Sequence, residues 1–170
     1  MTNANTKIIL VRPVDFVRDM GPLSTFLVTK DVELVATMKS AVEAGDTAIL
    51  VAEVGDKLAG IAMAHIRYRD DYGFVQDGET AGYIDGENAY LSLIDIHTPA
   101  RRRGIGTALL HALEAHVRPC GKRRMWLHTD ESNVVAHRFY EHNGWTHTVT
   151  VYPEWKKRRA TRVYSKEFCP

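Results

Sequence analysis

The chain has 170 residues, of which 45% are hydrophobic and 25% charged, and its formal net charge at pH 7 is +1. These values are ordinary for a globular domain, and the low net charge argues against a dedicated nucleic-acid binder. Cys120 and Cys169 are too few for a disulfide framework, and no apolar run is long enough to cross a bilayer. We expect one domain over residues 1–170, located in the cytoplasm, with a disordered polar N-terminus at residues 1–7.

The first part of the chain predicts a strand, short helices and a β-hairpin. One or two short helices are expected within Val14–Lys30, interrupted by Gly21-Pro22. Asp31 is placed to begin a further helix, which Gly45 would end. The expected strands are Ile8–Arg12 and, joined by a turn at Gly55–Lys57, Thr47–Val54 and Leu58–Arg69.

The segment Asp70–Asn88 differs in composition from the rest of the chain. It carries six acidic residues, no lysine or arginine, and four glycines. Such a segment is typical of a long solvated loop. It is also suited to attract a cationic ligand, and the sequence leaves both interpretations open.

The second part of the chain alternates predicted strands and helices. A central strand at Ala89–His97 leads into a helix at Gly104–Val117, and a second helix is expected from Asp130–Asn133 to Gly144. Further strands are expected at Met125–Thr129, Trp145–Tyr152 and Arg162–Phe168, with a basic turn at Lys156–Arg159.

A basic glycine turn joins the central strand to the first of these helices. Arg101 is three residues before Gly104, and Gly106 follows two residues later. Glycine allows main-chain N–H groups to approach a ligand closely, and the N–H groups that open a helix lack intrahelical partners. With the arginines beside them, such groups favour a diphosphate. Taken alone, the turn fits a solvated strand-to-helix connection equally well.

Several other kinds of site are disfavoured by the sequence. A dinucleotide-binding turn would place glycine or alanine where Leu109 stands, and no Gly-Lys-Ser/Thr tripeptide occurs. The helical histidine pairs are five residues apart, which does not suit a zinc site. No Gly-x-Ser-x-Gly elbow is present either. We therefore expect no metal and no serine nucleophile.

Arg101-x-x-Gly104-x-Gly106 between a strand and a helix resembles the acyl-CoA pyrophosphate loop of the GNAT superfamily of N-acetyltransferases. A second stretch, Asn133 to Trp145, is similar to the family pattern Asn-x-x-Ala-x-x-Leu-Tyr-x-x-x-Gly-Phe, with phenylalanine in place of leucine and tryptophan in place of phenylalanine. The resemblance implies an α/β (α+β) fold. Its mixed, twisted central sheet would have about seven strands, splayed at the centre, with helices on both faces.

The resemblance also implies a reaction and a set of site residues. An N-acetyltransferase moves the acetyl group of acetyl-CoA directly to a primary amine of a small molecule or peptide. In this chain the general acid would be Tyr140, and His128 stands where some family members carry a catalytic glutamate. Asp95, Glu87 or a water chain are alternatives for the base. The expected cofactor-binding residues are Ile94, Asp95, Ile96, Arg101, Arg102, Arg103, Gly104, Ile105, Gly106, Thr107, Asn133 and Tyr140.

Other functions and partners stay open at this point. A catalytically silent acyl-CoA-binding module, acting in regulation or interaction, is the alternative to an enzyme. Nucleic-acid association through Lys156–Arg162 ranks far behind both, and we expect neither nucleic acid nor membrane as a partner. Homodimers are common in the family, so a homodimer and a monomer both fit.

Overall fold

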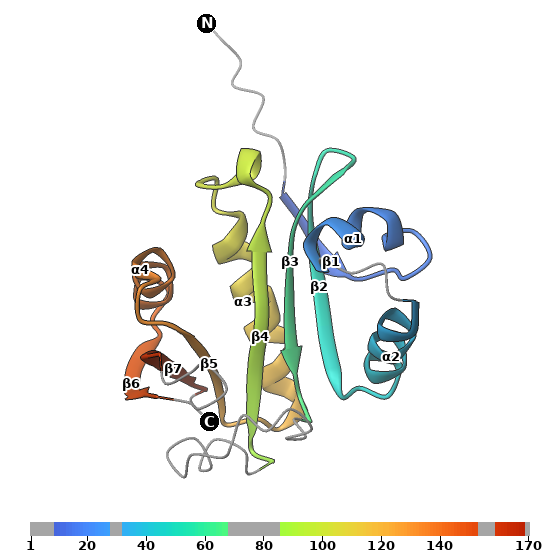
Figure 1. The fold of residues 1–170 in the computed structure, drawn as a ribbon. Helices are drawn as coiled ribbons and strands as arrows, with labels where there is room; N and C mark the ends of the chain where they lie inside the picture. The colour runs from blue at the N-terminus through green and yellow to red at the C-terminus, as the bar shows by residue number, and fades with distance from the viewer. Residues whose placement is uncertain (1–8, 28–31, 68–85, 153–158, 169–170) are drawn as a thin grey trace, which may run out of the picture. The chain divides into compact units, whose positions relative to one another are not determined.

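The computed structural model describes residues 9–27, 32–67, 86–152 and 159–168 of the chain. Within these residues, strands and helices follow the order predicted from the sequence (Figure 1). The strands form one mixed sheet in the order β1-β2-β3-β4-β5-β7-β6, which confirms the predicted fold class. The strands are β1 (Ile9–Pro13), β2 (Thr47–Val54), β3 (Lys57–His65), β4 (Asn88–Ile96), β5 (Arg124–Asp130), β6 (Thr146–Val151) and β7 (Thr161–Glu167). The α-helices are α1 (Met20–Leu27), α2 (Val32–Glu43), α3 (Ile105–Val117) and α4 (Val134–His142).

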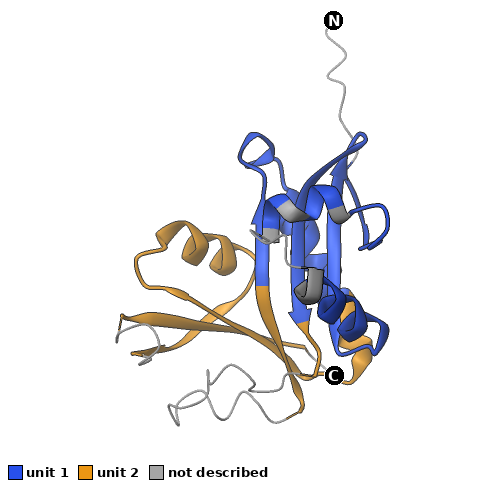
Figure 2. Cartoon of the chain, turned by 45° about the vertical axis from the view of Figure 1, so that its right-hand side comes forward, with its two compact units in different colours: residues 1–64, 93–115 blue, residues 65–92, 116–170 orange. Residues whose placement is uncertain are grey.

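The chain forms two compact units. Unit 1 comprises residues 1–64 and 93–115, and unit 2 comprises residues 65–92 and 116–170 (Figure 2). The boundary falls within β4, so residues 88–92 of this strand belong to unit 2 and residues 93–96 to unit 1.

Unit 1 has an apolar core between its strands and the first two helices. Leu23 and Phe26 of α1 are buried with Ile49, Val51 and Ile61 of β2 and β3, and Met38 and Val42 of α2 pack against this cluster. Gly60 comes directly before Ile61 in β3, so a side chain at position 60 would point to the face of the sheet opposite to Ile61. A Cβ at Gly60 would meet the side chains of Ile96 and Leu109, the latter in α3. Helices therefore cover both faces of the sheet in unit 1.

An ion-pair network ties β1 and β2 to the start of α1. Arg12 donates to both carboxylate oxygens of Asp19, at 2.7 and 2.8 Å, and to Glu53 at 2.6 Å. Asp19 is only 2% exposed, and its main-chain oxygen accepts the first hydrogen bond of the helix, from Leu23. The hydrogen bonds from Arg12 outweigh the effect of burial and lower the pKa of Asp19 below its ordinary value.

Unit 2 places different residues on the two faces of its sheet. β5 and β7 are antiparallel, with Leu127 opposite Tyr164 and His128 opposite Val163. Tyr90, Trp126, Val151 and Val163 form an apolar cluster on one face. α4 covers the other face, where the rings of Tyr140 and Tyr164 are 5.9 Å apart.

The parallel pairing of β4 with β5 is short. It joins Asn88–Tyr90 to Arg124–Trp126. β4 continues to Ile96 and β5 to Asp130, beyond the end of this ladder. The ladder between these two strands therefore ends at Tyr90 and Trp126.

Two details of the predicted elements were wrong. Gly21 and Pro22 do not interrupt a helix but lie in the first turn of α1, where proline is tolerated because the early N–H groups have no intrahelical acceptor. β3 ends at His65, four residues before the predicted end of that strand. The expected N-terminal tail, the Asp31 cap, most of Asp70–Asn88 and Lys156–Arg158 lie outside the described residues.

Candidate functional site

The predicted basic loop, residues 101–107, connects β4 to α3 in unit 1. A single 3-10 turn at Thr98–Ala100 precedes it. Arg102 and Gly104 both have left-handed backbone angles, with φ of 58° and 77°. A non-glycine residue in this region carries strain, which persists mainly where the surrounding structure needs that conformation. The arginines at 101–103 are exposed, whereas Ile105 is only 1% exposed and anchors the first turn of the helix.

The first turn of α3 is open to an anion. Its first internal hydrogen bond runs from Ala108 N to Gly104 O, so the N–H groups of Ile105, Gly106 and Thr107 have no acceptor within the helix. These groups lie at the positive end of the helix dipole. Arg102 and Arg103 add charge beside them. The geometry suits a phosphate or diphosphate group.

Arg101 has a more specific structural role than the sequence suggested. Its Nε donates to the carbonyl of Ile96 at 2.8 Å, and its Nη2 lies 3.4 Å from the Asp95 carboxylate. The same carboxylate accepts from the N–H of Ile96 at 2.8 Å. Ile96 is among the residues expected to bind the cofactor. In this structure its N–H and its carbonyl are paired with these two side chains, because Asp95 and Arg101 both fold back on the end of β4.

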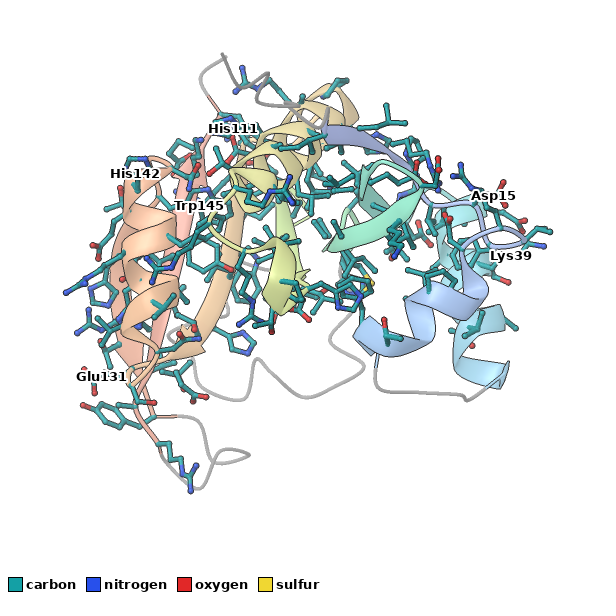
Figure 3. All side chains as sticks on the ribbon, turned by 90° about the horizontal axis from the view of Figure 1, so that it is seen from above. Asp15, Lys39, His111, Glu131, His142 and Trp145 are labelled. Atoms are coloured by element: carbon teal, nitrogen blue, oxygen red, sulfur yellow. The ribbon has the colours of Figure 1, made fainter. Side chains whose placement is uncertain are left out.

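Asn133 begins α4 in unit 2. Its side-chain oxygen accepts from the N–H of Ala136 at 3.2 Å, which makes it the N-cap of the helix. Figure 3 labels His142, the last residue of this helix, and Glu131, three residues before its first residue. At the far end, Gly144 has a φ of 79° and lets the chain turn into Trp145, which is 3% exposed.

Tyr140 lies on the inner side of α4. It is 7% exposed, and its ring is within 6 Å of the rings of Trp145 and Tyr164, at 5.7 and 5.9 Å between centroids. Burial raises the pKa of Tyr140 well above its usual range. The hydroxyl therefore stays protonated at neutral pH, as a proton donor must.

His128 belongs to a stack of three rings in unit 2, whose residues come from β3, β4 and β5. Tyr90 is the middle ring, with His65 on one side and His128 on the other. The Tyr90 hydroxyl lies 2.9 Å from Nδ1 of His128 and 3.5 Å from its Nε2. His128 itself is half-buried.

The two residues predicted to manage protons lie on opposite faces of the sheet. His128 shares a face with Trp126, because alternate residues of a strand point the same way. Leu127 points to the other face with its partner Tyr164, against which Tyr140 packs. Tyr140 and His128 are thus not brought together on one face. Any chemistry that uses both must reach the sheet from its two sides.

The other predicted bases are engaged in ion pairs. Glu87 pairs with Arg123 at 2.8 Å, and Asp95 holds Ile96 and Arg101 as described above. Each of these carboxylates thus already has an arginine beside it. His128 is the remaining side chain among the predicted bases.

Tyr90 and His65 were not singled out from the sequence. Tyr90 stands within an apolar strand segment, where an aromatic residue indicates only a core position. The pairing of Tyr90 with Trp126 brings its hydroxyl beside His128, two residues further along β5. No local sequence signal encodes that register.

Two kinds of feature were not found in the part of the chain that the structure describes. It holds no group of three or more histidine, cysteine, aspartate or glutamate side chains placed to bind a metal ion. None of the helices in this part is both long and apolar enough to cross a membrane.

The loop, the capped helix and the sheet order together point to one class of protein. Residues 20–145 match the acetyltransferase (GNAT) family. The chain belongs to this family and is an acyltransferase, as the resemblance implied. Among curated protein sequences, none is similar enough to this chain to count as a match.

Solved structures of the same fold cover nearly the whole chain. The ribosomal-protein-alanine N-acetyltransferase of Brucella melitensis has a TM-score of 0.73 and 18% identity, over 94% of this chain and 99% of its own. A GNAT-family acetyltransferase of Streptococcus pneumoniae has a TM-score of 0.69 and 18% identity, over 95% and 100%. yncA of Salmonella typhimurium, whose structure holds its cofactor acetyl-CoA, has a TM-score of 0.70 and 18% identity, over 94% and 93%. At such identities the likeness concerns the fold.

Proposed function

We propose that this protein is an N-acetyltransferase that transfers the acetyl group of acetyl-CoA to a primary amine. The observation that carries the proposal is the basic loop of unit 1, where Arg102 and Gly104, both with left-handed backbone angles, lead into the open first turn of α3. Family membership and the acetyl-CoA in a structural neighbour support acetyl-CoA as the donor. The reaction needs three elements, namely a grip on the diphosphate, a proton acceptor for the amine and a proton donor for the thiolate.

The diphosphate grip is assigned to residues 101–107. Arg102 and Arg103 supply charge, and the N–H groups of Ile105, Gly106 and Thr107 supply directed donors. Replacing Arg102 and Arg103 by alanine should weaken acetyl-CoA binding by roughly tenfold and flatten its salt dependence. Isothermal titration calorimetry at two salt concentrations measures both effects. Lys39→Ala, in α2, is the control for the loss of a positive charge outside the loop, since Lys39 pairs with Glu43.

Tyr140 is proposed as the general acid. The neutral amine attacks the thioester carbonyl, the carbon–sulfur bond breaks, and the Tyr140 hydroxyl protonates the departing CoA thiolate. The position of Tyr140 in the second family motif, seven residues after Asn133, supports this role. Tyr140→Phe should lower kcat about 100-fold or more, the usual contribution of a positioned acid, with little change in acetyl-CoA affinity. Full activity in Tyr140→Phe would remove the residue from the mechanism. Tyr152→Phe, at an exposed tyrosine, is the control.

His128 is proposed as the base that accepts the amine proton, and because it lies on the opposite face of the sheet from Tyr140, the proton passes to it through water. An imidazole has an ordinary pKa suited to this work near neutrality. The decrease of kcat/KM on the acidic limb of its pH profile should then report the protonation of His128. Loss of that limb in His128→Ala is the expected result, and an unchanged limb would refute the assignment.

The acceptor is proposed to be a cationic amine. The support is compositional, since Asp70–Asn88 carries acidic residues and no basic ones. Neutralising Asp70, Asp71 and Asp77 should raise the acceptor KM severalfold and leave acetyl-CoA binding unchanged. An unchanged acceptor KM would contradict this part of the proposal.

The decisive experiment measures CoA release from acetyl-CoA against a panel of acceptors. The panel contains polyamines, aminoglycosides, small amines and peptides with a free N-terminal alanine, the last because of the name of the Brucella melitensis neighbour. Turnover that falls in Tyr140→Phe is the expected result. Acetyl-CoA binding with no turnover of any acceptor would favour the catalytically silent acyl-CoA-binding module. No binding would refute the assignment of the basic loop.

A further inference from the structure

Tyr164 of β7 packs against one face of α4, the helix that carries Tyr140. Tyr164 is fully buried, at 0% exposed. Its ring lies 5.8 Å from the ring of His137 and 5.9 Å from that of Tyr140, and its hydroxyl donates to Oε1 of Glu141 at 3.0 Å. These three partners are residues i, i+3 and i+4 of the helix, which lie on one face. Tyr164 therefore contacts two successive turns of α4 at once.

These contacts oppose a rotation of α4 about its own axis. Successive residues of an α-helix are about 100° apart around the axis, so Tyr140 and Glu141 lie on the two sides of His137. Rotation in either direction would move one of the two away from Tyr164. Phe139, whose ring is 5.2 Å from that of Tyr140, belongs to the helix and would turn with it. Tyr164 belongs to the sheet and is thus a fixed reference for the helix.

The hydroxyl of Tyr164 also connects α4 to a second side chain of β7. Arg162 stands two residues earlier in the strand, and its side chain hydrogen-bonds to the same oxygen. Arg162 also lies 3.7 Å from Glu131, just before the start of α4. Burial raises the pKa of Tyr164, so its hydroxyl keeps a proton to donate to Glu141 at neutral pH. β7 therefore holds α4 near both of its ends.

We propose that Tyr164 is the positioning residue of Tyr140, because its bond to Glu141 fixes the rotation of α4 and hence the direction of the Tyr140 hydroxyl. The inference rests on the proposed role of Tyr140 as general acid. A proton donor must lie within hydrogen-bonding reach of the group that it protonates, and a misplacement of about 1 Å can lower a rate about 100-fold. The hydroxyl stands at the end of a long side chain, so a small helix rotation displaces it further than the helix itself. Tyr164 neither gains nor loses a proton in the reaction.

Substitutions of Glu141 test the inference without changing an aromatic ring. Glu141 is exposed, so Glu141→Ala should fold, and it removes the acceptor of the Tyr164 hydroxyl. We expect kcat to fall about tenfold, while the Kd for acetyl-CoA in isothermal titration calorimetry changes less than about twofold. Glu141→Gln keeps an acceptor oxygen and should recover most of the lost kcat.

Thr148→Val is the matched control for the loss of a hydrogen bond to β7. Thr148 Oγ1 lies 3.2 Å from Oγ of Ser165, the residue that follows Tyr164. Ser165 points to the other face of the sheet, away from Tyr164. Thr148→Val should therefore leave kcat unchanged.

A Tyr140→Phe background separates positioning of Tyr140 from a general effect on structure. Since Glu141 is argued to act through the Tyr140 hydroxyl, Glu141→Ala should not lower kcat further once that hydroxyl is absent. Tyr164→Phe keeps the ring and removes the same bond, so it should match Glu141→Ala, and the two together should add nothing. An equal loss of kcat with and without the Tyr140 hydroxyl would overturn the inference. An unchanged kcat in Glu141→Ala would overturn it as well.

Nuclear magnetic resonance of isotope-labelled tyrosine rings in the unliganded full chain gives a readout that needs no turnover. The Tyr140 signals are those that disappear in Tyr140→Phe. They should shift or broaden in Glu141→Ala and stay close to their wild-type positions in Glu141→Gln and Thr148→Val. Unchanged Tyr140 signals in Glu141→Ala would overturn the inference. If the signals change as expected while Tyr140→Phe keeps full activity, Tyr164 orients Tyr140 but the proposed general-acid role fails.

Discussion

Replacing Gly60 by alanine should both destabilise the protein and weaken acetyl-CoA binding, because Gly60 of β3 lies against the end of β4. A Cβ at this position would be 2.5 Å from Cδ1 of Ile96, 3.0 Å from Cδ1 of Leu109 and 3.1 Å from the carbonyl oxygen of Asp95. The first of these is about 1 Å closer than ordinary carbon–carbon contact. The added methyl group therefore has no room unless its neighbours move.

The loss of stability in Gly60→Ala depends on which of the neighbouring atoms can move. Ile96 can change rotamer, at about 1 kcal/mol for an unfavourable χ angle. Leu109 is fully buried, and the Asp95 oxygen belongs to the main chain, so neither yields cheaply. Overpacking of this kind costs about 1–3 kcal/mol. For a chain of this size each 1 kcal/mol lowers Tm by roughly 2–4 °C.

The binding effect follows from the same displacement. Shifting Asp95 and Ile96 disturbs the main-chain segment that Arg101 holds just before the basic loop. We expect the Kd for acetyl-CoA to rise about three- to tenfold, equivalent to roughly 1 kcal/mol. Urea unfolding and isothermal titration calorimetry on the same samples measure the two effects.

The matched control is Gly21→Ala in α1. No heavy atom lies within 4 Å of a Cβ built there, and alanine favours helix by about 0.5–1 kcal/mol over glycine. This variant should keep or gain stability and bind acetyl-CoA normally. A Gly60→Ala protein with unchanged Tm and unchanged Kd would refute the packing argument.

Two further predictions concern the ends of helices. Asp19→Asn should cost about 3 kcal/mol at pH 7, because it breaks a buried pair with Arg12, and urea unfolding at several pH values measures it. The pKa of Asp19 is lowered in the folded state, so its contribution is full above the ordinary carboxyl pKa near 4 and lost as pH falls below it. The stability difference between Asp19→Asn and wild type should therefore shrink below pH 4, and a constant difference would contradict the assignment. Asn133→Ala removes the N-cap of α4 and should cost about 1 kcal/mol in thermal unfolding. Asn133→Ser, which retains a capping oxygen, should recover most of that loss.

Much of the fold could be predicted from the sequence because its signals are local. The apolar positions Ile105, Leu109 and Leu113 recur at helical spacing, and all three are buried in α3. Gly144 ends α4 with a positive φ, as a glycine after a helix is suited to do. The errors arose where a local signal was ambiguous, as at Pro22, which is compatible with a break or with a first helical turn.

The candidate site was predictable where one short segment contains it. The basic loop combines its glycines, arginines and helix start within seven residues, so its chemistry could be inferred before the structure. Asn133 and Tyr140 could be proposed as site residues for the same reason, being one helix length apart. In each case neighbours in sequence are also neighbours in space.

Contacts between strands were decided only by the tertiary structure. Arg101 turns back onto Ile96, and the hydroxyl of Tyr90 meets His128, because a strand end and a sheet register bring them together. His128 and Tyr140 lie on opposite faces because of the register between β5 and β7, which pairs His128 with Val163 and Leu127 with Tyr164. By itself the sequence determined the elements, the family and the basic loop, because these are encoded in local spacing. The partners of each reactive group depend on strand register, which many distant apolar contacts select together.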